Sequence, residues 1–224
     1  MERDGTKTRM SRADRRAQLL SVAREMIRSD GLGALTMAGL AERAAVAKPV
    51  VYTHFKGSRH VAIALLDEHF EVITKLFEER VSAAITLSSY VESVVEAAFA
   101  FESVSEIPVR KIANGFSAGD EVNQVFLRHE AAFREHWQQL LILMGVPADR
   151  TVVAASILSA MVGSAIATSK AEELRHDRAT LTLLLTAALD ALTSDNASPG
   201  QRDRTFDEPV YRLIQNARIP GLIS

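Results

Sequence analysis

The sequence contains no cysteine among its 224 residues. A disulfide framework and a Cys-ligated metal site are therefore excluded, which suits a protein of the reducing cytoplasm. Proline (6) and glycine (11) are few, and this favours helices over β-structure, while a hydrophobic fraction of 47% can fill a substantial core. The N-terminus is charged and lacks an apolar stretch, so we expect no secretory signal and a cytoplasmic protein.

Motifs of catalysis are absent as well. The chain has no Gly-rich phosphate loop and no Gly-x-Ser-x-Gly elbow. Its histidines follow neither an HExxH pattern nor the spacing of a closed metal site; they are His54, His60, His69, His129, His136 and His176. We therefore expect no enzyme, no metal and no cofactor, and an enzyme built on a helical bundle is the least favoured alternative.

Charge is divided unevenly along the chain. Residues 1–60 hold 12 Lys and Arg against 6 Asp and Glu, a net charge of +6, whereas residues 61–224 carry a net charge of −8. A basic segment of this kind is the electrostatic footprint of a polyanionic partner. A solvated basic face would give the same count.

The stretch 36–59 predicts two short helices joined by a tight turn. Thr36 can cap the first helix, because its hydroxyl accepts from free backbone N–H groups. Pro49 is tolerated in the first turn of the second helix, where Val51 and Phe55 lie four residues apart and face a core. This is the helix-turn-helix pattern, whose second helix enters the DNA major groove. Spacing alone does not separate it from a helix pair inside an ordinary bundle.

Residues 41–55 read Ala-x-x-Ala-x-Val-x-Lys-Pro-Val-Val-Tyr-x-His-Phe. This run resembles the signature of the TetR family of bacterial transcriptional regulators, and the likeness extends from Arg12 to about Leu66. The resemblance implies an all-α fold, with an N-terminal three-helix helix-turn-helix DNA-binding head and a larger helical ligand-binding and dimerisation body. We assign the arm and head to residues 1–57, the body to 58–195 and a tail with one short docked helix to 196–224.

Three positions depart from the family pattern. The family commonly has Gly where this chain has Ala45, Ser where it has Ala47, and Lys where it has Ser58. The third departure matters most, because that lysine is a typical phosphate contact in the family. Lys56 and Arg59 are close enough in sequence to take its place.

The candidate DNA contacts lie on and around the second helix of the pair. We expect Lys48, Val50 and Thr53 at base edges, and Tyr52, His54, Lys56 and Arg59 at phosphates. The full set is Thr36, Arg43, Lys48, Pro49, Val50, Tyr52, Thr53, His54, Lys56 and Arg59.

An aromatic set between residues 99 and 137 surrounds a broken helical pattern. Large side chains at such a break can enclose an apolar pocket with a few polar groups. The ligand candidates are Phe99, Glu102, Phe116, Phe126, His129, Phe133 and Trp137. The alternative is that these side chains are ordinary core residues.

Two apolar helices are expected near residues 149–170 and 177–193. The run 152–169 carries no charge over eighteen residues, yet it holds several Ser and Thr and lacks flanking anchors, so we expect no membrane span. Small and leucine side chains at helical spacing predict a four-helix bundle between two subunits. The predicted interface residues are Ala155, Ser159, Gly163, Ala167, Leu181, Leu185 and Leu189. Complete burial of these helices within one chain is the alternative.

Together these observations predict a homodimeric repressor that binds a palindromic double-stranded DNA operator and is released by a small apolar or amphipathic effector. A long helix starting at Ser58 would connect the head with the body. The alternative is a helical ligand-binding or scaffold protein that has lost specific DNA reading.

Overall fold

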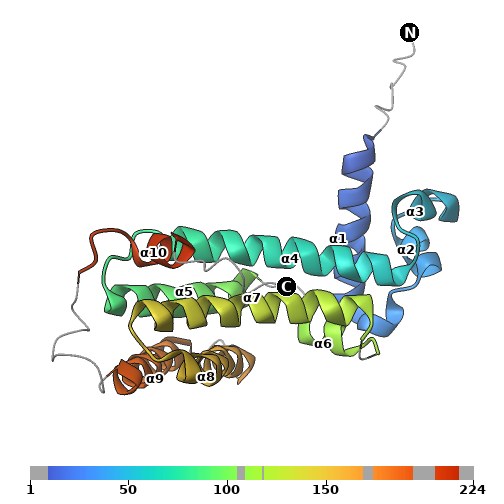
Figure 1. Cartoon of the computed structure of the whole chain (residues 1–224). Helices are drawn as coiled ribbons and strands as arrows, with labels where there is room; N and C mark the ends of the chain where they lie inside the picture. The colour runs from blue at the N-terminus through green and yellow to red at the C-terminus, as the bar shows by residue number, and fades with distance from the viewer. Residues whose placement is uncertain (1–9, 105–108, 118, 169–173, 194–204, 217–224) are drawn as a thin grey trace, which may run out of the picture. The chain divides into compact units, whose positions relative to one another are not determined.

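The computed structural model describes residues 10–104, 109–117, 119–168, 174–193 and 205–216. In these ranges the secondary structure is helical, apart from one isolated bridge between Thr86 and Thr205, so the prediction of an all-α fold is confirmed. The helices are α1 (Arg12–Asp30), the 3-10 turn η1 (Leu32–Ala34), α2 (Met37–Arg43), α3 (Lys48–His54), α4 (Ser58–Val81), α5 (Leu87–Val104), α6 (Val109–Asn114), α7 (Glu121–Leu143), α8 (Ala148–Thr168), α9 (Leu174–Thr193) and α10 (Val210–Asn216) (Figure 1).

The chain divides into two compact units, which we call the head unit and the body unit. The head unit is Met1–Glu68 with Glu106–Phe126, and the body unit is His69–Ser105 with Leu127–Ser224. This division differs from the predicted boundary at residue 57. The start of α4, α6 and the start of α7 all belong to the head unit, and both long helices continue into the body unit.

The head unit forms around one face of α1. Ser11 caps this helix, since its hydroxyl oxygen accepts a 3.0 Å hydrogen bond from the Asp14 N–H. Gly31 ends it at φ +81°, where its N–H bonds to the carbonyl of Ile27. The buried residues of the head unit include Leu19, Leu20, Ala23, Met26, Ile27, Leu40, Ala41, Val51, Phe55, Val61, Leu65 and Leu66. This core holds α2 and α3 in place.

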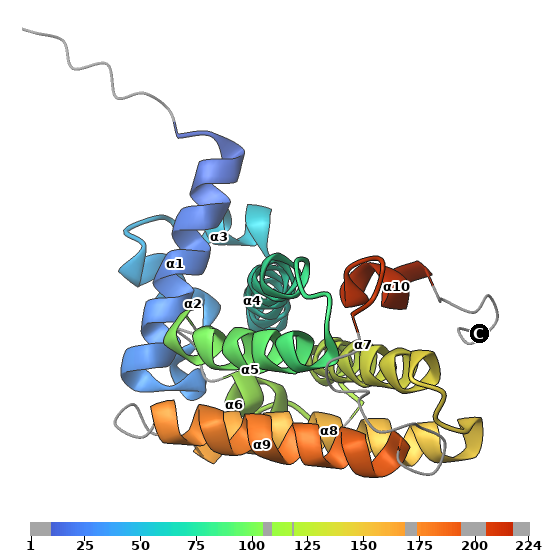
Figure 2. The same cartoon turned by 90° about the vertical axis from the view of Figure 1, so that its left-hand side faces the viewer.

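Within the body unit, α8 and α9 run side by side and α5 packs on both (Figure 2). The largest fully buried side chains there are Trp137, Tyr90 and Phe99. The short helix α10 docks on this unit through buried Val210 and Ile214. Tyr211 donates a 2.8 Å hydrogen bond to Glu78, and this bond adds a polar anchor.

Two titratable side chains, Tyr90 and His136, contact each other in the body unit. A short hydrogen bond joins the Tyr90 hydroxyl and Nε2 of His136. The rings of Phe77 and Tyr211 also contact His136. Burial lowers the pKa of His136 from 6.5 to about 4 and raises the pKa of Tyr90 well above its usual value, so both side chains are neutral at physiological pH.

Candidate nucleic-acid interface

The first helix of the predicted pair begins at its expected cap. Thr36 is the N-cap of α2, and its hydroxyl oxygen accepts a 3.0 Å hydrogen bond from the Gly39 N–H. A Cβ at Gly39 would lie 3.1 Å from that oxygen and 3.2 Å from the Met26 side chain. Glycine at this position therefore permits both the cap and the close packing of α2 on α1.

The turn between α2 and α3 is a Schellman motif with an unusual residue. The Val46 N–H bonds to the carbonyl of Ala41 at 3.0 Å, and the Ala45 N–H bonds to that of Glu42 at 3.1 Å. Ala45 has φ +52°, and it is the single non-glycine residue with positive φ in the described ranges. This left-handed conformation costs an L-residue about 1–2 kcal/mol, which gives a physical reason for glycine at this position in the resembling pattern.

Helix α3 buries one side and presents the other to solvent. Val51 is 0% and Phe55 3% exposed. Of the predicted contacts, Lys48, Pro49, Tyr52, Thr53 and Lys56 are exposed, and Val50 and His54 are half-buried. Tyr52 is 54% exposed, which is unusual for a large aromatic side chain. The structure therefore brings an aromatic ring, a lysine and small side chains onto the surface of one short helix, and a second exposed lysine follows it at position 56.

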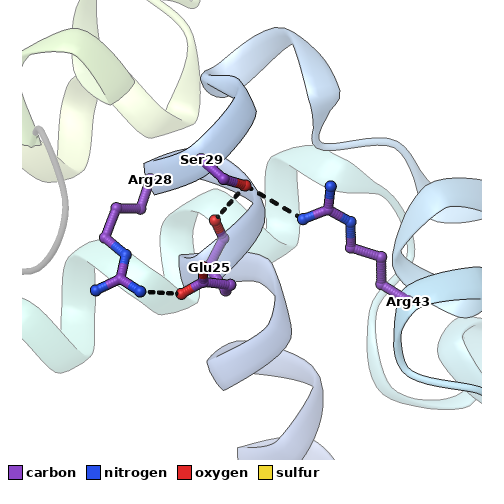
Figure 3. Close-up of polar contacts among 4 residues, drawn as sticks. All are labelled: Glu25, Arg28, Ser29 and Arg43. Atoms are coloured by element: carbon purple, nitrogen blue, oxygen red, sulfur yellow. Dashed lines mark hydrogen bonds and ion pairs between the residues drawn. The ribbon is translucent and has the colours of Figure 1, made fainter.

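Arg43 does not lie free on this surface. Its guanidinium donates a 3.2 Å hydrogen bond to the Ser29 hydroxyl (Figure 3). The same guanidinium forms a short ion pair with Asp30. Ser29 in turn donates to the carbonyl of Glu25 at 3.0 Å, and that residue's carboxylate pairs with Arg28. Arg43 thus ties the end of α2 to the end of α1.

Arg59 is also engaged within the chain. Its guanidinium lies 2.8 Å from the Asp120 carboxylate, with side chains 54% and 9% exposed respectively. The other oxygen of that carboxylate accepts a 3.0 Å hydrogen bond from the Val122 N–H at the start of α7. A phosphate contact by Arg59 would have to compete with this fixed acid.

A basic groove lies between the start of α1 and the end of α3. It has a volume of about 510 Å³ and is lined by Arg12, Ala13, Arg16 and His54. Burial and the nearby charges of Arg12, Arg16 and Arg15 lower the pKa of His54 from its usual 6.5. The arginines were not among the predicted contacts. The signal that could have identified them is the four-residue spacing of Arg12 and Arg16, which places two cations on one side of a helix.

Comparison with known proteins points to one family. The sequence model described as "Bacterial regulatory proteins, tetR family" matches residues 19–65, which include α2, its turn and α3. The helix-turn-helix segment of the chain is therefore similar to that of the TetR family. A relative named HTH-type transcriptional activator FasR, from Mycolicibacterium smegmatis, is 32% identical over 93 residues. That alignment spans 42% of this chain and 42% of the relative.

Solved structures show the same fold over most of the chain. A TetR-family regulator, SCO4454 from Streptomyces coelicolor, has a TM-score of 0.68 at 18% identity and covers 81% of this chain and 97% of its own. GusR from Salmonella enterica has a TM-score of 0.65 at 20% identity, with coverages of 81% and 98%. The predicted architecture of a helix-turn-helix head and a helical body is therefore confirmed.

The predicted ligand residues fall into two groups in the structure. Phe116 and Phe126 belong to the head unit, where Arg110 lies over the Phe126 ring. In the body unit Phe99 and Trp137 are fully buried, Phe133 is half-buried against the same core, and His129 stacks on Phe70 at 3.8 Å between ring centroids. The side chain of Glu102 lies outside the described residues. Phe99, Phe133 and Trp137 thus pack in the core of the body unit, and Arg178 lies over the Phe99 ring.

The predicted interface residues require a correction. Ala155, Leu181, Leu185 and Leu189 are 0–3% exposed and belong to the core of a single chain. Ser159 and Gly163 are half-buried, and Ala167 is exposed. Both helices have two apolar sides, and the stripes chosen from the sequence are largely the ones that face the core. The exposed side instead carries Val152, Val153, Ile157, Leu183 and Leu184, which are 50–69% exposed.

A membrane span and a metal site are two further possibilities for the described residues. One helix, α8, is long and apolar enough to cross a membrane by length and composition, and 28% of its window is buried. The core helix of a globular protein passes the same test, so this is weak evidence for a span. No group of three or more metal-ligating side chains occurs in the described part of the chain.

Proposed function

We propose that this chain is a DNA-binding transcriptional regulator that inserts α3 into the major groove of a palindromic operator. The observation that carries the proposal is the exposed surface of α3, a helix fixed by the head-unit core, which presents Lys48 and Tyr52. Lys56 is exposed two residues after the helix ends. Lys48, Val50 and Thr53 face base edges, because polar and methyl groups there can read the groove. Tyr52, His54 and Lys56 contact phosphates, which position the helix.

The functional form is a homodimer joined through α8 and α9. Five aliphatic side chains, Val152, Val153, Ile157, Leu183 and Leu184, lie at least half exposed on two helices that run side by side. Exposed apolar patches of this kind mark interaction surfaces, and a two-fold axis makes such a patch self-complementary. Two α3 helices would then enter successive major grooves about 34–36 Å apart.

A small apolar or amphipathic effector acts through the body unit, and in its absence the dimer represses. The effector shifts the population of head spacings by binding two arrangements unequally. Activation in place of repression also has support, because the relative FasR is named a transcriptional activator. Transcription in vitro from a promoter with a mapped operator separates the two, because a repressor lowers transcript yield and an activator raises it.

The test begins with selection of bound sequences from a randomised duplex pool, followed by fluorescence anisotropy against the selected duplex and a scrambled one. We expect sequence-dependent binding that weakens steeply with salt. The double variant Lys48→Ala/Tyr52→Ala should lose about 100-fold or more in affinity yet keep its helical circular dichroism. Lys75→Ala is the matched control, because Lys75 is an exposed lysine of α4 paired with Glu71.

Either of two results would contradict this proposal. Selection that enriches no sequence favours the alternative of a ligand-binding or scaffold protein without specific DNA reading. A double variant that binds as tightly as the unmodified chain removes α3 from the DNA interface.

A further inference from the structure

The groove beside α3 is built from two elements of the head unit. Arg12 and Arg16 come from the first two turns of α1, and His54 is the last residue of α3. The guanidinium carbon of Arg16 lies 4.5 Å from the centroid of the Phe55 ring, which holds the side chain over a buried surface. Two cations and an imidazole therefore share one open concave site of about 510 Å³.

The positive charge of this groove is not balanced within the described residues. No ion pair there involves Arg12, Arg15 or Arg16, whereas Arg24, Arg28, Arg43 and Arg59 each contact a carboxylate. The nearest acid in sequence, Asp14, accepts a 2.6 Å hydrogen bond from the Ser11 hydroxyl. Arg15 donates instead to the side-chain carbonyl of Gln18. Within residues 10–68 the other arginines are thus paired with carboxylates, and this cluster is left open to an external anion.

We propose that this groove holds one phosphate group of the DNA backbone, and that filling it draws a proton onto His54. The inference rests on the proposed DNA-binding function and extends the contact surface from α3 to the start of α1. Guanidinium groups suit the site because their planar donors bind two phosphate oxygens at once. An imidazolium adds a third charged donor from the opposite wall.

The sign of the proton linkage follows from the surrounding charges. In the free protein, burial and the arginines Arg12, Arg16 and Arg15 lower the pKa of His54, so its imidazole is neutral near pH 7. A bound phosphate places a negative charge against the same ring and raises the pKa again. Binding therefore takes up a proton. Affinity is highest below the pKa of the free state, and it falls as pH rises from there through the higher pKa of the bound state.

The remaining groups around His54 do not reverse this sign. The ring of Phe55, 6.5 Å away between centroids, is uncharged. On α1 the charges facing the ring are those of Arg12, Arg15 and Arg16, and these are the groups that act on its pKa. These positive charges disfavour a protonated His54, and a bound anion would offset them.

The experiment measures anisotropy of the full chain with a random-sequence duplex of about 30 base pairs, over a salt series near pH 6 and pH 8. We expect roughly tenfold tighter binding at the lower pH, since each pKa unit of difference corresponds to a factor of ten. His54→Gln should remove this pH dependence, and His60→Gln, which changes an exposed histidine of α4, should keep it. Arg12→Gln/Arg16→Gln should weaken binding and reduce the slope of log affinity against log salt by about 1 to 2. Arg28→Gln, at the other end of α1, is the control for that double variant.

Equal affinity at both pH values, or a pH dependence that survives His54→Gln, would overturn the inference while leaving DNA binding intact. Absence of duplex binding by the unmodified chain at low salt would instead reject the proposed function. NMR titration of the His54 ring with inorganic phosphate, against chloride at the same ionic strength, distinguishes the sources. A rise in pKa with phosphate but none with duplex would assign the groove to a free anion and overturn its role in DNA binding.

Discussion

The head unit and the body unit expose apolar surface in different ways. In the described part of the head unit the large exposed hydrophobic residues are Met10 and Tyr52. Tyr52 lies on α3, which also exposes Lys48. In the body unit, α8 and α9 together expose five aliphatic side chains, and α8 has no charged residue between Thr151 and Thr168. One surface is suited to a hydrated polyanion, and the other to removal from water by a second apolar surface.

Salt concentration tests this difference directly. Contacts with phosphates release counterions, so their affinity falls as salt rises. Burial of aliphatic side chains depends little on ionic strength. The two surfaces can therefore be disturbed one at a time, and each variant below changes one of them or the unit that supports it.

The largest expected effect comes from placing charge on the exposed face of α8 and α9. Ile157→Asp/Leu184→Asp would bury two carboxylates in an apolar interface, which costs several kcal/mol. We expect sedimentation to show a monomer, with operator affinity reduced by about 100-fold or more because two half-sites are no longer joined. Val72→Asp is the control, since Val72 is 44% exposed on α4. A dimer that survives the double variant would place the interface elsewhere.

The two units also differ in the role of a histidine, and a change of pH is expected to affect folding at one and binding at the other. The pKa of His136 in the body unit is about 4 in the folded chain against 6.5 when exposed. As pH falls below 6.5, the unfolded chain gains a proton that the folded chain does not, so stability declines. We expect a loss of about 2 kcal/mol between pH 7 and pH 5 from this group.

Urea unfolding of the unmodified chain and of His136→Asn at both pH values checks this prediction. The variant should be less stable at pH 7, because it loses the contact with Tyr90, but should show a smaller change with pH. An unchanged pH dependence would mean that other groups carry the acid sensitivity. The effect on folding in the body unit contrasts with the expected effect on binding at His54 in the head unit.

The sequence predicted local features of the head unit well, because those features have local causes. The cap at Thr36, the turn at residues 45–47 and the burial of Val51 all depend on neighbours within a few residues. The pairing of Arg59 with Asp120 joins residues far apart in the chain. Hydrophobic periodicity gives no information about such a pair. The sequence therefore predicted that Arg59 would be available to contact a phosphate.

In the body unit the sequence predicted where the helices occur along the chain. It did not predict which side of each helix faces the core. Leu181, Leu185 and Leu189 form a regular stripe, but Leu183 and Leu184 on another side of α9 are equally apolar. Hydrophobic periodicity identifies an apolar side without saying which side faces the core of the same chain. That choice depends on the packing of α5 against α9, which is a tertiary property.

A smaller effect is expected from releasing Arg59. Asp120→Asn retains an oxygen that can accept from the Val122 N–H, but removes the charge that binds the guanidinium. The freed cation can reach a phosphate, so we expect about threefold to tenfold tighter DNA binding at low salt and a salt slope steeper by about 1. Arg59→Gln added to this variant should cancel the gain. Unchanged affinity in Asp120→Asn would mean that Arg59 does not approach the DNA.

The smallest effect comes from the same turn built once in each unit. Residues Ala45-Val46 end α2, and Gly145-Val146 end α7, with matching Schellman hydrogen bonds from Val46 to Ala41 and from Val146 to Leu141. The φ values are +52° and +81°. Ala45→Gly relieves about 1–2 kcal/mol of left-handed strain but makes the unfolded chain more flexible, so we expect a net gain in stability of up to about 1 kcal/mol.

Gly145→Ala should show the opposite change, a loss of about 1 kcal/mol, because a Cβ there would meet nothing within 4 Å and the backbone conformation alone is disfavoured. Thermal unfolding of both variants measures the pair. Destabilisation by Ala45→Gly would indicate that the methyl group of Ala45 contributes packing that outweighs its strain. Opposite signs would establish that the head unit keeps alanine at a conformational cost, and DNA affinity of Ala45→Gly would then report whether that cost helps to fix the angle of α3.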